Sequence, residues 1–245
     1  MLAILGWQTL SVAAVLGGWE AAVRLGFVDA LFVPAPSAVA SALTATLGEA
    51  MPRLADTLVK TLIGYGLAVG LGVTLGLVIG STRTLHQVAT PYVVALYGIP
   101  KILILPWIAL IFGVGLTTAV LSATLFAVFP IILLVAAAVR DLDPSLITVA
   151  VSMGASRWQI YRKVILPAVL PSALAGMRIG MVFAMLGVLL AEMFAGTRGM
   201  GFLMQRFAVA FKAPELFAAT ALVSALSIGV VLSLEHLNRR LGRWR

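Results

Sequence analysis

Long apolar stretches alternate with short polar connections along the whole chain. About six stretches reach the ~20 residues that a helix needs to cross the ~30 Å hydrocarbon core of a bilayer. They predict membrane-spanning helices at about Leu2–Val23, Thr57–Gly80, Val88–Phe112, Leu116–Val139, Ser172–Met193 and Leu216–Glu235. The predicted fold class is an all-α membrane protein, with residues 1–245 forming a single transmembrane domain.

Composition and charge narrow the classes of function. The chain of 245 residues is 62% hydrophobic and 11% charged, which is far outside the range of soluble domains. Cysteine is absent, which excludes a disulfide scaffold, a thiolate metal site and a thiol nucleophile. The net charge of +8 would suggest nucleic acid binding in a soluble protein, but in a membrane protein it is typical of positively charged cytoplasmic loops. We therefore expect these positive charges to lie beside a membrane and not to bind nucleic acid.

The distribution of Lys and Arg predicts the orientation. One set of loops, together with the C-terminal tail, carries Arg83, Arg140, Arg157, Arg162, Lys163, Arg239, Arg240, Arg243 and Arg245. The opposite set carries Arg24, Arg53, Lys60, Arg198, Arg206 and Lys212. Because cytoplasmic loops hold the excess of basic residues, the first set and both termini are predicted to be cytoplasmic. On the outer side, Ser37 is expected to cap a short interfacial helix from Ala38 to about Ala50.

A polar loop of residues 140–171 separates the fourth and fifth predicted spans. Asp143 before Pro144 is typical of an N-cap followed by proline at the first helical position, and Gly154 suits the left-handed residue that ends a helix. These signals predict a helix over Pro144–Met153.

A second short helix is predicted directly after the first. Ser156 and Gln159 have the spacing of a capping box, and Pro167 and Pro171 are expected to interrupt the helix before the fifth span. The two helices would meet at Gly154 as a compact bend, which we call the elbow. A bent helix pair of this kind can dock into a groove on a soluble partner.

The elbow resembles the EAA loop of permease subunits of bacterial ABC importers. That loop reads Glu-Ala-Ala, three residues, Gly, nine residues, Ile-x-Leu-Pro. The matching positions are Ala150, Gly154, Leu166 and Pro167, and the differing positions are Thr148 for Glu, Val149 for Ala and Val164 for Ile. The missing Glu removes one polar contact that the family makes with its ATPase.

Other segments are similar to the nitrate, sulfonate, taurine and bicarbonate permease branch of that family. They are residues 32–37, Tyr97-Gly98-Ile99-Pro100-Lys101 through Leu105-Pro106, residues 112–115, and Ala191-Glu192-Met193 followed by residues 198–202. The resemblance implies a type I importer fold, a homodimer, two cytoplasmic ATPases and an extracytoplasmic binding protein. It also implies that ATPase coupling runs through Thr148, Val149, Ala150, Ser152, Met153, Gly154, Ala155, Ser156, Arg157 and Pro167.

The energy source is expected to lie in another polypeptide. The chain has no Gly-x-x-x-x-Gly-Lys-Ser/Thr phosphate loop, so it does not bind ATP by that route. We therefore predict a transport subunit that is not itself an enzyme and holds no cofactor, with ATP and Mg²⁺ bound by the partner.

Lys101 is the most conspicuous charge within a predicted span. A lysine at the centre of a membrane helix costs on the order of 3 kcal/mol on insertion scales, so it should face a partner or a water-filled cavity. Lys101 either lines the pathway and offers positive potential to an anion, or is a structural cation satisfied by carbonyls freed at prolines, by Glu192 or by Glu20. The candidate pathway residues are Tyr97, Pro100, Lys101, Met181, Met185 and Glu192.

Small residues form stripes on two predicted spans. Gly72, Gly76 and Gly80 repeat every fourth residue, as do Gly176 and Gly180. Such stripes let helix backbones approach closely. They predict packing within one subunit or, alternatively, a dimer interface or a sliding contact during gating.

These observations predict a permease subunit of an ATP-driven importer for a small anionic solute, working by alternating access. The alternative is a stand-alone ion-coupled transporter, which would need no nucleotide. For the substrate, thiamine-pyrimidine precursors and aromatic acids are the alternatives.

Overall fold

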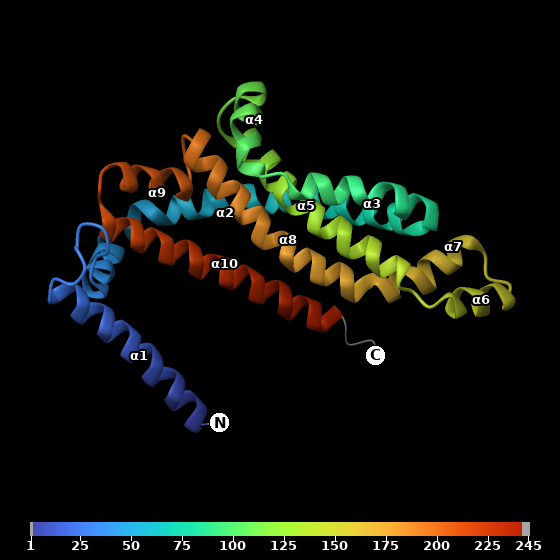
Figure 1. The fold of residues 1–245 in the computed structure, drawn as a ribbon, viewed down its shortest axis with the longest axis horizontal. Coiled ribbons are helices and arrows are strands. Elements are labelled where there is room, and N and C mark those ends of the chain that lie inside the picture. The colour runs from blue at the N-terminus through green and yellow to red at the C-terminus, as the bar shows by residue number, and fades with distance from the viewer. Residues whose placement is uncertain (1, 242–245) are drawn as a thin grey trace.

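The computed structural model describes the backbone of residues 2–241 and the side chains of residues 6–236. Within this part of the chain every regular element is helical. Four helices are long and apolar enough to cross a membrane, namely α2 (Pro36–Ser81), α5 (Leu116–Arg140), the continuous helical segment Arg157–Ala195 and α10 (Ala213–Leu241). A bent pair, α3 (Arg83–Gly98) with η1 (Lys101–Ile104) and α4 (Leu105–Phe112), makes a fifth if it counts as one span. The first predicted span forms as α1 (Leu2–Arg24), which stands apart from the main bundle in Figure 1.

The predicted break between an interfacial helix and the second span is wrong. α2 runs without interruption for 46 residues and begins after Ala35, so Ser37 lies inside the helix instead of capping it. Pro52 lies inside α2, where both Pro52 and Gly48, the residue whose carbonyl loses its helical partner, line an open cavity. Ser37 instead binds Glu20 of α1, through its backbone N–H at 3.0 Å and its hydroxyl at 2.7 Å.

The third predicted span is not one straight helix. α3 and the η1–α4 segment are bent by 79° at residues 99–100. Proline disfavours a helical conformation in the residue before it, and Ile99 before Pro100 is extended, with ψ of 129°. Lys101 therefore lies at a break between two helices and not near the middle of a continuous one.

The prolines at 167 and 171 do not interrupt the helix before the fifth span. α7 (Arg157–Ile160) continues through a π-helical turn, η2 (Tyr161–Ile165), into α8 (Leu166–Ala195). The π turn shifts the hydrogen-bond ladder just before Pro167, which occupies the first turn of α8, so the chain stays helical.

The core is a layer of three helices in which α5 lies between α2 and α8. Its buried residues are mainly small, including Ala68 of α2, Ala123 and Ala127 of α5, and Ala184 of α8. The predicted glycine stripes pack within the subunit. A Cβ at Gly76 would lie 2.7 Å from the Val135 Cβ, and Gly72 and Gly80 meet Ile131 and Val139 in the same way. Gly176 and Gly180 of α8 approach α5 from the other side.

One helix was not predicted. α9 (Met200–Val209) packs on α8 and α10 through Met200, Leu203 and Phe207. It lies at the opposite end of the long axis from α6 (Pro144–Ser152) and α7 (Figure 1). The molecule therefore has two distinct ends, one formed by the elbow and one by α9 with the first half of α2.

Candidate functional site

The elbow forms as predicted from its caps. Asp143 begins α6 by accepting a hydrogen bond of 2.8 Å from the backbone N–H of Ser145, and this bond lowers the pKa of Asp143. Ser156 begins α7 with a complete capping box, in which the Gln159 N–H donates to the Ser156 hydroxyl at 3.3 Å and the Gln159 side chain accepts from the Ser156 N–H at 2.8 Å.

Gly154 makes the bend between these two helices. Its φ of +76° lies in the left-handed region, which residues with a Cβ rarely adopt. The turn is closed by hydrogen bonds from Gly154 N–H to the Val151 carbonyl at 2.9 Å and from Ala155 N–H to the Ala150 carbonyl at 3.0 Å. The glycine therefore fixes the angle at which α7 leaves α6.

The outer surface of the elbow is apolar and unpartnered in the single chain. α6 has no buried residue. Its exposed large apolar side chains, with those of the bend and α7, are Leu146, Val149, Val151, Met153 and Trp158, whereas Ile147 lines a cavity toward the core. Met153 is 82% exposed, although charged residues on both sides place this segment outside the hydrocarbon region. Such a surface suits binding to another protein.

The predicted coupling residues do not all lie together. Thr148 through Arg157 lie on the elbow, but Pro167 lies beyond the π turn in the first turn of α8. The Thr148 hydroxyl, at the position of the family's Glu, donates to the Pro144 carbonyl at 3.1 Å. It is therefore engaged with its own helix.

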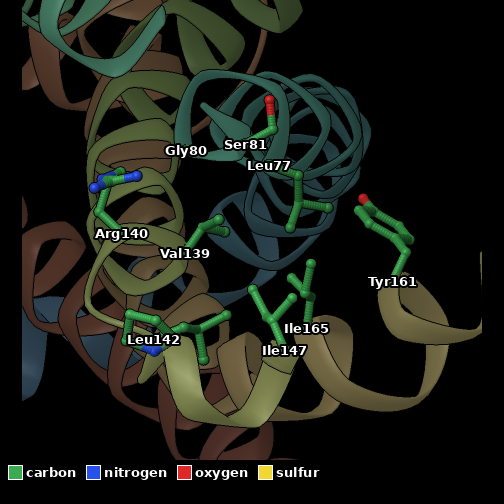
Figure 2. A pocket seen from close by; sticks show the side chains of 10 residues that line it. Leu77, Gly80, Ser81, Val139, Arg140, Leu142, Ile147, Tyr161 and Ile165 are labelled. Carbon is green, nitrogen blue, oxygen red and sulfur yellow. The ribbon is translucent and has the colours of Figure 1, made fainter. Parts of the chain in front are cut away.

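A cavity of about 270 Å³ lies between α6 and the core (Figure 2), whereas Ile160 of α7 is buried. Leu77 of α2 and Val139 of α5 line one side, and Ile147 of α6 and Ile165 of the π turn line the other. The polar group of Tyr161 lies at its margin. Because α6 does not fill this space, few packing contacts restrain the elbow against the membrane core.

Lys101 binds a backbone carbonyl at the end of α3 and not an acidic side chain. Its Nζ donates to the Tyr97 carbonyl at 2.8 Å, which the end of α3 leaves without its usual helical partner. The ammonium also lies 4.6 Å from the ring centroid of Tyr97 and 5.2 Å from that of Phe129. Glu20 binds Arg24 at 2.6 Å and Glu192 binds Lys60 at 2.9 Å, so neither carboxylate partners Lys101.

The candidate pathway residues fall into two groups. Tyr97, Pro100 and Lys101 surround the break after α3. Met181 and Met185 are buried in the interior of α8, 2% and 3% exposed, and Met185 packs with α9. In this conformation the methionines do not line an open surface, and their role in the pathway stays a prediction.

Glu192 belongs to a buried polar cluster at the α9 end. Its carboxylate is 1% exposed and accepts from Lys60 Nζ at 2.9 Å and from the Thr57 hydroxyl at 2.8 Å. Lys60 also binds Asp56 at 2.6 Å. We call Asp56, Thr57, Lys60 and Glu192 the outer polar cluster.

Sequence reasoning identified Glu192 and missed its partners. Lys60 was assigned only to the outer loops, whereas it lies inside α2 and is 6% exposed. Asp56 and Lys60 stand four residues apart, the spacing of a helical ion pair, and that pattern was the available signal. Within residues 6–236, no group of three or more His, Cys, Asp or Glu side chains is placed to hold a metal ion.

Comparisons with known proteins agree with this architecture. Residues 68–243 match the family described as binding-protein-dependent transport system inner membrane component. The riboflavin transport system permease protein RibX of Chloroflexus aurantiacus is 34% identical over 92% of this chain and 85% of its own length. The taurine transport system permease protein TauC of Escherichia coli is 30% identical over 96% of this chain and 90% of its own length.

A solved structure shares the fold. A chain from the inward-facing MetNI methionine ABC transporter superposes with a TM-score of 0.66 and 22% identity, over 79% of this chain and 94% of that one. The chain therefore belongs to the family of binding-protein-dependent transport system inner membrane components, as a permease subunit of an ABC importer.

Proposed function

We propose that this chain forms the membrane pathway of an importer that is driven by ATPases docked on its elbow. The observation that carries the proposal is the elbow itself. It is a capped, bent helix pair with an exposed apolar surface, and a cavity lies between α6 and the core. A partner that binds this surface can move α6 without first breaking a tightly packed interface with the core. Motion of the elbow would pass through the π turn into α8, because the two are one continuous helical segment.

The working unit would contain two copies of this chain, two ATPases and one extracytoplasmic binding protein. The bent segment η1–α4 exposes Leu103, Trp107 and Leu110, so one copy leaves an apolar face uncovered. A second copy facing the first across such surfaces would enclose a pathway between them. Alternating access would then be the opening of this pair, first toward the binding protein and then toward the cytoplasm.

The elbow would face the cytoplasm in a bacterial inner membrane. Arg140, Arg157, Arg162 and Lys163 lie at the elbow end, which agrees with the positive bias of cytoplasmic loops. Six passes of the chain would return the C-terminus to the side of the N-terminus, so both termini would be cytoplasmic. The tail arginines that support this orientation, from Arg239 onward, lie outside the described side chains.

The proposed substrate is a small anion of the sulfonate, taurine or nitrate type. The similarity to a taurine permease supports it, as does the half-buried Lys101, whose ammonium has a single hydrogen-bond partner in the structure. The similarity to a riboflavin permease and, at 27% identity, to a formylaminopyrimidine permease of Halalkalibacterium halodurans keeps a heterocyclic substrate as the second candidate.

Uptake should require ATP and the partner ATPase. Proteoliposomes that hold this chain with its cognate ATPase and binding protein should accumulate radiolabelled taurine only when ATP is supplied. Vesicles that hold the chain alone should accumulate none, with or without an imposed proton or sodium gradient. Gradient-driven accumulation by the chain alone would instead establish the ion-coupled alternative, and accumulation of riboflavin but not taurine would replace the proposed substrate.

Replacing Lys101 with methionine should reduce anion uptake more than assembly. The substitution removes the positive charge but keeps a long flexible side chain beside Tyr97 and Phe129. We expect uptake to fall about tenfold, the effect of losing one charge-assisted contact in a water-poor site, while the amount of purified complex stays the same.

Two variants make the Lys101 test specific. Lys101→Arg keeps the charge and should keep most of the uptake, and Lys212→Met removes an exposed lysine near α9 and should change nothing. Equal losses of uptake and assembly in Lys101→Met would show that this lysine is structural.

A further inference from the structure

We propose that Glu192 and Lys60 form a positioning pair that holds α9 and the α8–α9 turn in the orientation that receives the extracytoplasmic binding protein. This inference rests on the proposed function for the identity of the partner. The geometry of the pair itself does not depend on that function.

The start of α9 is held by side chains from two other helices. The backbone N–H of Gly201 donates to Glu192 Oε2 at 3.0 Å, and the N–H of Met200 donates to the Thr57 hydroxyl at 2.8 Å. The N-cap residue of α9 is Gly199, which has no side chain to cap the helix. The free N–H groups at a helix start need acceptors, and here α8 and α2 supply them.

The carboxylate is seated directly against the α9 backbone. A Cβ on Gly201 would lie 2.8 Å from the Glu192 Cβ, and Gly199 has a φ of +107°. Side chains at these two glycines would displace the Glu192 side chain. The close approach therefore fixes α9 relative to α8 as well as capping it.

Lys60 connects the two walls of an outer cavity. This cavity of about 520 Å³ has one wall from α2, including Arg53 and Asp56, and the other from the α8–α9 turn, residues 197–199. Lys60 binds Asp56 of the first wall at 2.6 Å and the Arg198 carbonyl of the second at 3.2 Å. Its third partner, Glu192, lies beneath both.

The Glu192–Lys60 pair is charged, which packing of α9 alone does not require. Packing alone would be served as well by apolar residues, because removing two charges from water costs about as much as their attraction returns. Asp56 is only partly buried and offers Lys60 a second carboxylate, so Lys60 stays paired if the turn moves away from α2. A pair of this kind sets the width of the cavity in the resting state and still permits it to open.

The absence of native cysteine allows a direct test by thiol labelling. The reporter is Leu203→Cys, at a position on the inner face of α9 that is 0% exposed. The purified chain in detergent micelles is labelled with fluorescein maleimide in three backgrounds: otherwise native, Glu192→Gln and Lys60→Met. We expect the labelling rate to rise about tenfold in both variants, because Glu192→Gln weakens the acceptor of the Gly201 N–H and Lys60→Met leaves the buried Glu192 carboxylate without its cation.

Three controls separate local release of α9 from general unfolding. Phe27→Cys is exposed in the connection between α1 and α2, far from the pair, and should react at one rate in all backgrounds. Ala123→Cys lies in the α5 core at 0% exposure and should stay unreactive in all of them. Arg206→Met breaks the exposed pair between Arg206 of α9 and Glu49 of α2 and should leave the Leu203→Cys reporter protected. Unchanged protection of Leu203→Cys in both Glu192→Gln and Lys60→Met would overturn the positioning pair.

A second measurement tests the consequence for the partner. In the assembled complex, Glu192→Gln should raise the binding-protein concentration for half-maximal ATPase stimulation about tenfold, a larger factor than any fall in basal ATPase activity. Lys60→Arg, which keeps the donors, should lose less affinity for the binding protein than Lys60→Met. A purely structural role would lower basal and stimulated activity in parallel and would contradict the inference. The labelling assay needs neither ATPase nor transport, so its result stands even if the proposed function fails.

Discussion

Replacing Gly154 with valine should reduce ATP-driven uptake at least tenfold while insertion and subunit assembly continue. At a φ of +76°, a residue with a Cβ costs roughly 1–2 kcal/mol relative to glycine, and a β-branched one costs more. The strain is relieved if α7 rotates away from α6, and this rotation breaks the hydrogen bond from the Ala155 N–H to the Ala150 carbonyl. The apolar surface would then no longer be presented as one unit. The measurements are uptake into proteoliposomes, ATPase activity and copurification of the ATPase with the variant.

A second glycine with the same backbone conformation serves as a control, because it separates the effect of backbone strain from the effect of lost coupling to the ATPase. Gly26 lies in the connection between α1 and α2, has a φ of +77° and, like Gly154, has open space where a Cβ would lie. Gly26→Val carries the same backbone strain far from the elbow and should preserve uptake. Gly154→Asn should keep most of the coupling, because asparagine tolerates the left-handed region. Full uptake with Gly154→Val would refute a coupling role for this bend.

The elbow was predictable because its signals are local. Asp143, Gly154 and Ser156 act on backbone groups within a few residues of themselves, so their roles are visible in the sequence. The cavity beneath the elbow was not predictable. It is lined by residues of α2, α5, α6 and the π turn, so it depends on how these distant segments pack together, and no short-range pattern records that packing.

Proline was the main source of error in the helix boundaries. Pro100 ends a helix, whereas Pro52 and Pro171 lie inside continuous ones. At Pro100 the preceding residue, Ile99, is extended, so α3 ends there and the Lys101 ammonium binds the Tyr97 carbonyl at that end. At Pro52 the helix continues, and an open cavity lies alongside it.

The outer polar cluster shows the limit of sequence reasoning for the site. Glu192 and Lys60 are separated by 132 positions, and α2 and α8 come together only in the folded bundle. The sequence marks each residue as a costly charge within an apolar stretch, but the identity of its partner is a property of the fold. Lys101 illustrates the same point, since none of its predicted acidic partners binds it.

Replacing Gly76 with leucine should prevent most molecules of the protein from folding. A Cβ at this position would lie 2.7 Å from the Val135 Cβ and 2.9 Å from the Ile132 carbonyl oxygen. The second contact is with backbone, so a rotamer change cannot relieve it and α2 must move away from α5. Overpacking of a close-packed core costs about 1–3 kcal/mol, and here it acts on the main helix interface of the protein. The yield of monodisperse protein and its unfolding temperature in detergent should both fall.

Gly70 on the same helix is the matched control. A Cβ there meets nothing within 4 Å, and the neighbouring Leu67 and Leu71 are exposed. Gly70→Leu should leave the yield unchanged or raise the unfolding temperature slightly, because glycine is about 1 kcal/mol less favourable than the best helix formers in a helix interior. The opposite pattern, with Gly76→Leu tolerated and Gly70→Leu failing to associate with a second copy, would mean that the stripe serves the dimer. Packing within the subunit requires the failure at Gly76, because α5 leaves no room on that face for a side chain of any size.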